Sequence, residues 1–327
     1  MQPHPLVYLS VADVVAAMPP IAERLRLAER TMTALVADAD LPSKISVHPR
    51  PPGSFGHAMP AFLHGTDGQD LLGIKWVTGF PENAEKGVPV IAATVVLNDP
   101  VTGLPTAILD GAPIGAQRTA AISGVAIARY APQGAKRVGV VGAGVQAHSH
   151  LPVLGHLLPD AEIAVFDRHP ERAAALVDAA LATPGIGGAV AAQSARDAVA
   201  GADVVVTVAS FTTPDRRGVM TGDWLAPGAL VVPVDYATMC APSVARDAAL
   251  FLVDDRGQFL AHRDAGEFDD YPDPTATFGE AILAGTPRPA AGRVVAMHLG
   301  VGLADVVFAD AIVRRAAELG LGTSWPG

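Results

Sequence analysis

The sequence predicts an α/β protein built from two kinds of sheet, one largely antiparallel and one parallel and doubly wound. Between residues 44 and 109, short apolar runs follow one another with only turn-forming residues between them, which is typical of antiparallel strands. From residue 137 onward, apolar strands alternate with helical segments, which is typical of a parallel sheet covered by helices.

The N-terminal part is expected to begin with two helices. Ser10 can cap a short helix that ends at Pro19-Pro20, and apolar residues recur at helical spacing from Ile21 to Asp38. Strands are then expected at Lys44–His48, Phe55–Leu63, Leu71–Phe80, Val90–Asn98 and Leu104–Leu109. A helix over Ile114–Tyr130 closes this part, since Pro132 stops it.

The second part contains six strand candidates, the number in a complete doubly wound nucleotide-binding domain. They are Arg137–Val141, Ile163–Phe166, Ala189–Ala192, Val204–Ala209, Leu230–Val234 and Leu250–Val253. Helices are expected at Glu171–Leu181 and Ala195–Ala200, and a last helix at Val301–Leu319 with Gly320 as its C-cap. The acidic segment Asp254–Asp273 is interpreted as solvated surface rather than a metal site.

Bulk properties narrow the class of protein. A chain of 327 residues suggests about two domains, and its net charge of -10 argues against nucleic acid or an anionic membrane as a partner. No apolar stretch is long enough to span a bilayer, and the N-terminus lacks a signal-peptide layout. The single cysteine, Cys240, is interpreted as a small buried side chain and fits a cytoplasmic location, and no Cys/His spacing indicates a metal.

The strand at 137–141 leads into a glycine-rich turn, Gly142-Ala143-Gly144-Val145-Gln146-Ala147, that opens a helix. Such a turn aims backbone N–H groups and the positive helix end at a pyrophosphate. Gly142 permits the turn, Gly144 allows close approach of the phosphates, and Ala147 lets the helix pack on the strand. We therefore expect Gly142, Gly144, Val145, Gln146 and Ala147 to bind NAD or NADP.

Asp167 ends the next strand, close to the spacing of about 20 residues at which a ribose-binding acid is expected. Its carboxylate would accept both ribose hydroxyls and repel a 2′-phosphate, which favours NAD. Arg168 and His169 follow at once and would instead suit the 2′-phosphate of NADP.

Two cations stand in contexts that suggest an anionic ligand. Lys75 lies in the middle of an apolar strand, where burying its charge is unfavourable unless the ammonium is paired or bound to an anion. Arg118 lies in the second turn of its helix, near helix-end amides that favour a carboxylate or phosphate. The alternatives are a snorkelling surface lysine and an exposed helix arginine.

The order of these pieces resembles the ornithine cyclodeaminase/mu-crystallin family. The matching stretches include PSKISVH, FGHAMPAF, LLGIKWVTGFPENAEKGVPV, QRTAAISGVAIARY, VGVVGAGVQAHSHL, LAPGALVVPVD and LGVGLADV. The resemblance implies a Rossmann domain, 119–301, inserted into an antiparallel-sheet domain, 1–118 plus 302–327, that binds substrate and forms a homodimer. It also implies an active site in the cleft between the domains.

The resemblance assigns roles to single residues. Lys75 and Arg118 match residues that bind the substrate carboxylate, with Lys75 also at the reacting region, and Thr119 matches a residue close to the cofactor phosphates. Asp235 matches the catalytic aspartate, and Lys44 stands where many relatives carry an arginine. Lys44 keeps the positive charge of that arginine, but its ammonium cannot bind a carboxylate through two parallel N–H groups as a guanidinium does. We also expect cofactor contacts from Thr207, Ala209 and Val234.

His57 departs from the pattern of relatives that cyclise ornithine, which carry a glutamate there when the chain is aligned on Met59-Pro60. Losing that negative charge disfavours a basic substrate amine, and His57 and Met59 are expected to line the substrate pocket. The alternative for His57 is a structural histidine.

The family chemistry interconverts an α-amino acid and its α-imine by hydride transfer with a nicotinamide cofactor. We therefore expect an NAD(P)-dependent imine reductase or amino-acid dehydrogenase acting on a small amino or imino acid. A cyclodeaminase acting on ornithine or lysine, which recycles NAD and releases ammonia, is the alternative. A third possibility is a non-catalytic protein that binds the cofactor and a small ligand, as the crystallin branch suggests.

Overall fold

The computed structural model describes residues 5–325. Residues 1–4 and 326–327 lie outside the described part of the chain. The chain divides into two compact units. Unit 1 contains the residues up to Arg118 and those from Gly300 onward, and unit 2 contains Thr119–Leu299. Within the described residues, no helix combines the length and the apolar character that crossing a membrane requires.

Unit 1 is a mixed sheet with helices. Its elements are β1 (Leu6–Leu9), α1 (Val11–Ala16), α2 (Ile21–Ala37), β2 (Ala39–Asp40), β3 (Ile45–Val47), β4 (Phe55–Leu63), β5 (Leu71–Gly79), β6 (Ile91–Asn98), β7 (Pro105–Asp110), α10 (Gly302–Leu319) and β16 (Thr323–Trp325), with 3-10 turns at Thr66–Gly68 and Pro81–Ala84. Ser10 caps α1 through a capping box with Asp13, as expected. Helix α3 (Ala112–Tyr130) runs through the boundary between the units.

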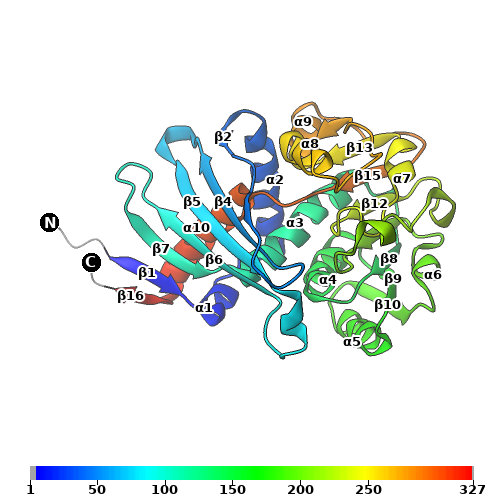
Figure 1. The fold of residues 1–327 in the computed structure, drawn as a ribbon, viewed down its shortest axis with the longest axis horizontal. Helices are drawn as coiled ribbons and strands as arrows, with labels where there is room; N and C mark the ends of the chain where they lie inside the picture. Colours follow the sequence, from blue (N-terminus) through cyan, green and yellow to red (C-terminus); the bar gives the residue numbers. More distant parts are fainter. Residues whose placement is uncertain (1–4, 326–327) are drawn as a thin grey trace. The chain divides into compact units, whose positions relative to one another are not determined.

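The sheet of unit 1 has the order β16-β1-β7-β6-β5-β4-β2, with β3 beside β4 (Figure 1). The predicted strands β3 to β7 are present and pair antiparallel with one another. Sequence reasoning missed β1, which pairs parallel to β7, and β16. Helix α10 packs on β4, β5 and β6, so the C-terminal segment covers one face of a sheet made by the N-terminal part.

Unit 2 alternates strands and helices. Its elements are β8 (Arg137–Val141), α4 (Val145–Leu157), β9 (Ala161–Phe166), α5 (Pro170–Leu181), β10 (Ile186–Ala191), α6 (Ala195–Val199), β11 (Val204–Thr207), β12 (Leu230–Pro233), α7 (Pro242–Arg246), β13 (Leu250–Val253), α8 (Arg256–Asp264), β14 (Ala276–Thr277), α9 (Phe278–Leu283) and β15 (Val294–Met297), with 3-10 turns at Pro214–Arg216 and Gly222–Trp224.

The sheet of unit 2 is parallel throughout, in the order β10-β9-β8-β11-β12-β15-β13-β14. The expectation of six strands is wrong, because β14 and β15 complete an eight-stranded sheet. Strand β15 inserts between β12 and β13, although it follows both in sequence. The strand order changes direction at β8 and β11, and in such sheets ligands bind at the carboxyl ends of the strands.

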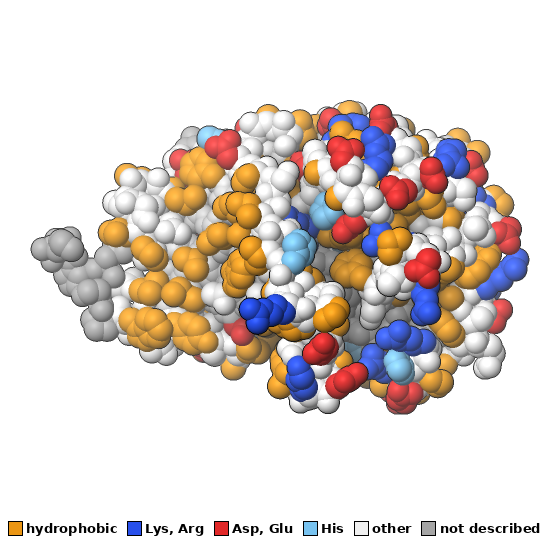
Figure 2. Space-filling model, in the orientation of Figure 1, with side chains coloured by type: hydrophobic (Ala, Val, Ile, Leu, Met, Phe, Trp, Pro, Cys, Tyr) orange, Lys and Arg blue, Asp and Glu red, His pale blue; other side chains and the backbone are white. Residues whose placement is uncertain are grey.

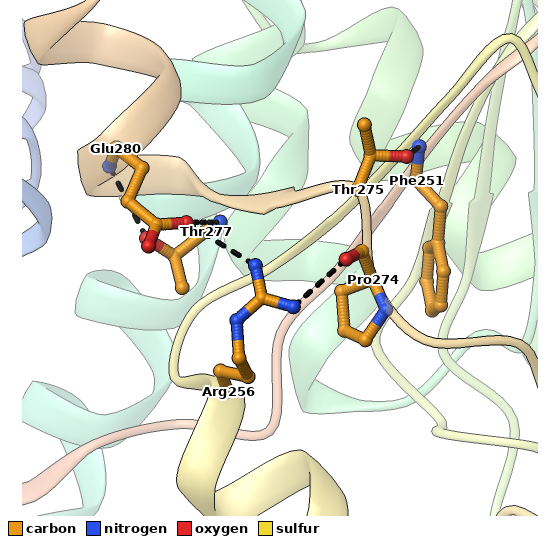
Figure 3. Close-up of polar contacts among 6 residues, drawn as sticks. All are labelled: Phe251, Arg256, Pro274, Thr275, Thr277 and Glu280. Carbon is orange, nitrogen blue, oxygen red and sulfur yellow. Dashed lines mark hydrogen bonds and ion pairs between the residues drawn. The ribbon is translucent and has the colours of Figure 1, made fainter.

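The acidic segment Asp254–Asp273 is only partly the solvated surface that was expected. Phe259 and Phe268 are fully buried and stack with their ring centroids 4.8 Å apart, because they complete the core over β13. Arg256 fastens this segment, since its guanidinium donates to the Pro274 carbonyl at 2.9 Å and to the Glu280 carboxylate at 3.4 Å (Figure 3).

Candidate active site

Lys75 lies on the face of β5 that α10 covers. Its neighbours across the sheet are Met59 on β4 and Val95 on β6. At Gly73, two residues earlier on the same face, an added Cβ would lie 3.0 Å from Val306 on α10. The Lys75 side chain is 5% exposed, so the alternative of a snorkelling surface lysine is wrong.

Asp305, in the first turn of α10, accepts hydrogen bonds from both predicted substrate-binding cations. Its Oδ2 lies 2.5 Å from Lys75 Nζ and its Oδ1 lies 3.2 Å from Arg118 Nε. Arg118 is 7% exposed, so the alternative of an exposed helix arginine is also wrong. Gly300 passes so close to Arg118 that a Cβ there would lie 2.7 Å from Nη1, and its φ of +82° further favours glycine.

Sequence reasoning missed Asp305, although it stands in the quoted stretch LGVGLADV. The available signal was an acid on the apolar stripe of a helix, where a charge is rarely buried unless it is paired. Burial opposes ionisation of Asp305, but Arg118 and Lys75 outweigh it and hold the pKa of its carboxyl below the ordinary value. The three side chains therefore form a buried ionic cluster.

The other predicted substrate-binding residues lie around this cluster in unit 1. Met59 is directly opposite Lys75, and His57 is opposite Val77, so both project from the face that carries Lys75. The His57 ring stacks on Phe55 with centroids 4.5 Å apart. Lys44, half-buried just before β3, is close enough to act electrostatically on Lys75.

In unit 2, the glycine-rich turn joins the carboxyl end of β8 to α4. Gly142 has φ +102°, and a Cβ there would lie 2.6 Å from the Val208 carbonyl oxygen, so both conformation and space require glycine. Gly144 is the N-cap of α4, where no side chain caps the free N–H groups of the first turn.

The turn fits the pyrophosphate of a dinucleotide. A Cβ at Gly144 would meet no atom within 4 Å, so the backbone borders open space there, and Val145 is 73% exposed beside it. Within the described residues, the buried Oε1 of Gln146 has no hydrogen-bond partner. Ala147, in the first turn of α4, is buried.

Asp167 immediately follows β9 and lies next to this turn. Its Oδ2 accepts the Ala143 N–H at 2.8 Å and its Oδ1 accepts the His169 N–H at 2.9 Å. Each carboxylate oxygen retains a second lone pair, so the group can still accept two ribose hydroxyls. Arg168 is exposed and donates to the His169 ring at 3.2 Å.

Asp235 lies just beyond β12, at the same edge of the sheet as the glycine-rich turn. Its Oδ1 accepts the Thr207 hydroxyl at 2.7 Å, and its Oδ2 accepts the Ala209 N–H at 3.0 Å. The Thr207 carbonyl in turn accepts the Val234 N–H at 2.9 Å. The ends of β11 and β12 thus bring together Asp235 with three of the predicted cofactor-binding residues.

Burial raises the pKa of Asp235 to about 7, although the Thr207 hydroxyl and the Ala209 N–H both favour its ionised form. Its side chain carries no salt bridge to a Lys or Arg within the described part of the chain, and the residue is only 2% exposed. A carboxyl group with this pKa can both give and take a proton near neutral pH.

A buried chain of hydrogen bonds, which sequence reasoning missed, supports the first turn of α4. His150 Nδ1 lies 2.6 Å from the Gln146 carbonyl, and burial lowers the pKa of His150 to about 4. The neutral ring therefore donates from Nδ1 and accepts the Ser123 hydroxyl at Nε2, 2.8 Å away. The Ser123 oxygen then accepts from His298 Nε2 at 2.9 Å. Thr119, one turn earlier on α3, is also buried.

Comparisons of the sequence with known proteins agree with this geometry. The model of the ornithine cyclodeaminase/mu-crystallin family matches residues 10–248. The nodulation efficiency protein NfeD of Rhizobium meliloti is 31% identical over 325 residues, covering 98% of each chain. The ketimine reductase mu-crystallin of Mus musculus is 31% identical over 260 residues, covering 78% of each.

Solved structures with the same fold contain a nicotinamide cofactor. The Δ1-pyrroline-2-carboxylate reductase of Thermococcus litoralis, in complex with NADH and L-proline, has a TM-score of 0.85 and 27% identity, covering 97% of this chain and 99% of that one. An archaeal alanine dehydrogenase dimer with bound NAD has a TM-score of 0.84 and 25% identity, covering 98% and 99%. Both cofactors are dinucleotides, and their pyrophosphate is the group that the turn at Gly142 fits.

If Asp167 binds the ribose as expected, replacing it by Ala reduces the preference for NADH over NADPH by at least about tenfold, because the carboxylate would accept ribose hydroxyls and would repel a 2′-phosphate. Fluorescence titration of both cofactors measures this as a ratio of Kd values. The ratio is the appropriate readout because loss of the contact between Asp167 and the Ala143 N–H is expected to weaken the binding of both cofactors. Asp178→Ala on the exposed side of α5 is the control, and an unchanged ratio in Asp167→Ala would show that this acid does not select the cofactor.

Proposed function

The chain belongs to the ornithine cyclodeaminase/mu-crystallin family, and from this premise we propose that it is an NAD-dependent reductase that converts an α-imino acid into an α-amino acid. The observation that carries the proposal is Asp235, a buried carboxyl group with a pKa of about 7 at the sheet edge that holds the dinucleotide turn. A binding protein without catalysis has no need of such a proton carrier.

Reduction of a C=N bond adds a hydride to the carbon and a proton to the nitrogen. NADH, when bound, supplies the hydride to the α-carbon and becomes NAD+. Asp235 in its protonated form gives its proton to the imine nitrogen and becomes a carboxylate, which the Thr207 hydroxyl and the Ala209 N–H stabilise. In the reverse direction the same carboxylate takes a proton from the amine.

Lys75 and Arg118 bind the substrate carboxylate in this proposal. Both cations are buried and share Asp305, so the cluster carries one net positive charge that a single carboxylate would balance. Holding that carboxylate fixes the orientation of the α-carbon, which is the contribution of such groups to the rate. Arg118 can do so through the guanidinium nitrogens that Asp305 does not use.

The substrate side chain is proposed to be neutral or acidic. His57 and Met59 share the sheet face of Lys75, and His57 is stacked on Phe55. The neighbours of His57 on β4 are therefore apolar, and position 57 provides no carboxylate to attract a distal ammonium. The L-proline bound in the related T. litoralis complex is an amino acid of this kind. Cyclic imines of small α-amino acids are accordingly the first substrates to test.

We further propose that the protein is a homodimer. The face of the unit 1 sheet opposite α10 exposes Ile45, Val47 and Trp76, which are 60%, 50% and 43% accessible. Strand register puts them on one face together with Ala58, and Figure 2 shows apolar side chains gathered over these strands. Such a face normally requires a partner, and the related alanine dehydrogenase is a dimer. A cytoplasmic location is supported by the single, buried Cys240.

The purified protein is expected to oxidise NADH steadily when given Δ1-pyrroline-2-carboxylate or another cyclic α-imino acid, with the matching amino acid as product. L-ornithine is expected to be a poor substrate, because His57 does not attract its distal ammonium. Absorbance of NADH and an ammonia assay measure the two reactions. Ammonia release from L-ornithine without net NADH formation would instead indicate a cyclodeaminase, and NADH fluorescence quenching without turnover would indicate a binding protein.

Replacing Asp235 by Asn is expected to lower kcat for imine reduction by about 10² to 10⁴-fold, because the variant has no proton to give. In the unaltered protein, activity is expected to fall as pH rises through about 7, where Asp235 loses its proton. The residual activity of the variant should not show this decline. Steady-state rates between pH 5.5 and 9 test both points, with exposed Asp247→Asn as the control. Retention of kcat would assign proton transfer to another group.

Replacing Trp76 by Glu is expected to give a monomer at micromolar concentration, because a charge would have to be buried at the centre of the proposed interface. Light scattering measures the mass. Leu181→Glu, an exposed apolar residue of α5 in unit 2, should leave the dimer intact. A monomeric unaltered protein would contradict the proposal directly.

A further inference from the structure

Asp305 differs from the cations that it binds because none of its surface is exposed. Its two oxygens are each used by a different partner, Oδ2 by Lys75 Nζ and Oδ1 by Arg118 Nε. The three groups come from β5, α3 and α10. A substrate that contacts the two cations therefore does not need to contact Asp305 itself, which can act only through them.

Besides anchoring α10, Asp305 affects the protonation of Lys75, because it supplies a negative charge beside two buried cations. Two cations buried side by side repel each other and lose hydration, and both costs favour loss of the lysine proton. Burial, Arg118 and Lys44 all lower the pKa of Lys75, and Asp305 is the group that raises it, so that the pKa comes to about 8. The remaining neighbours of Lys75 across the sheet, Met59 and Val95, carry no charge.

We propose that Asp305 is the positioning residue of the substrate-binding cations: it holds the Lys75 ammonium and the Arg118 guanidinium together and balances one of their two charges, so that they present one net positive charge to one carboxylate. The inference rests on the proposed function for the identity of that carboxylate, but not for the charge of Lys75. It predicts that loss of the Asp305 charge lowers the charged fraction of Lys75 at neutral to alkaline pH.

A purely structural alternative is that Asp305 only docks α10 on the sheet. The start of α10 has another close contact, because a Cβ at Gly302 would lie 2.5 Å from the Met59 carbonyl oxygen. Asp305→Asn preserves the shape of the side chain and removes its charge, whereas Asp305→Glu preserves the charge and lengthens the side chain. The two variants therefore separate charge from packing. Asp310→Asn on the same helix, where Asp310 pairs with Arg314, is the matched control.

The first experiment follows the charge of Lys75 without substrate. In protein labelled with ¹³C at the lysine ε-carbon, the NMR signal that is lost in Lys75→Met reports the titration of this residue. We expect its midpoint near pH 8 in the unaltered protein and in Asp310→Asn. In Asp305→Asn it should move by about one pH unit or more toward acid, because only the effects that lower the pKa of Lys75 remain. An unchanged midpoint in Asp305→Asn would overturn the inference.

The second experiment asks whether substrate binding follows that charge. A shift of about one unit lowers the charged fraction of Lys75 at pH 8 about fivefold. KM for the imino acid in Asp305→Asn should therefore rise about fivefold or more at pH 8 and less than about twofold at pH 6, with kcat little changed. Asp305→Glu should restore most of the difference. An equal rise of KM at both pH values would favour docking alone and contradict the inference.

These outcomes separate this inference from the proposed function. If the unaltered protein reduces no imino acid but Lys75 titrates as expected in the variants, the assignment of Asp305 stands and the proposed reaction is wrong. If imines are reduced but the Lys75 signal does not move, the reaction stands and the role of Asp305 is wrong. Should Asp305→Asn fail to fold, Arg118→Met tests the same charge balance with Asp305 left in place. Asp305 then faces Lys75 without the second cation, so the Lys75 midpoint should move toward alkaline pH, and an unchanged midpoint would overturn the inference.

Discussion

The ion pair between Lys75 and Asp305 joins residues that are 230 positions apart, and the architecture of unit 1 depends on it. A lysine inside an apolar strand and an aspartate on the apolar stripe of a helix are each unfavourable alone, since a buried unpaired charge costs several kcal/mol. Each becomes acceptable only when the other is present, together with Arg118. Helix α10 packs on β4, β5 and β6, and the pair fixes which of its residues faces Lys75 on β5.

The two units contain acids with opposite behaviour, and the difference has a simple physical origin. Asp305 has two cationic partners and its pKa lies below the ordinary value, so it remains a permanent charge. Asp235 is equally buried but is held by a hydroxyl and a backbone amide, and the desolvation of its carboxylate dominates. The fixed negative charge of Asp305 keeps two buried cations paired, whereas a group that changes its charge near neutral pH is able to carry a proton.

The sheet of unit 2 gathers residues from distant parts of the sequence because its strands are parallel. The carboxyl ends of β8, β11 and β12 lie at one edge, where the turn at Gly142, the pair Thr207–Ala209 and Asp235 meet. The buried chain from His298 through Ser123 to His150 then fastens the first turn of α4. The edge therefore combines free backbone N–H groups for an anion with one proton-carrying acid.

The sequence by itself determined the features that depend on local pattern. The bounds of β4, β8 and β13 agree with the predicted strands residue for residue, because alternation and flanking turn residues define them. The turn at Gly142 was likewise evident, since its glycines are required by backbone geometry. Lys75, Arg118 and Asp235 could be selected from the sequence because each is an ionisable residue in an apolar segment or in a family motif. In the structure all three are buried.

Only the tertiary structure decided which distant residues meet. Strand β15 was missed because Val294–Met297 is a short apolar run whose place between β12 and β13 follows from sheet order, not from sequence order. The aromatic residues of Asp254–Asp273 pack inward although acids surround them, since the core over β13 needs their volume. Asp305 was overlooked because its partners, Lys75 on β5 and Arg118 on α3, are distant in sequence. The ion pairs form only when α10 packs on the sheet of unit 1, so the local sequence around Asp305 does not indicate them.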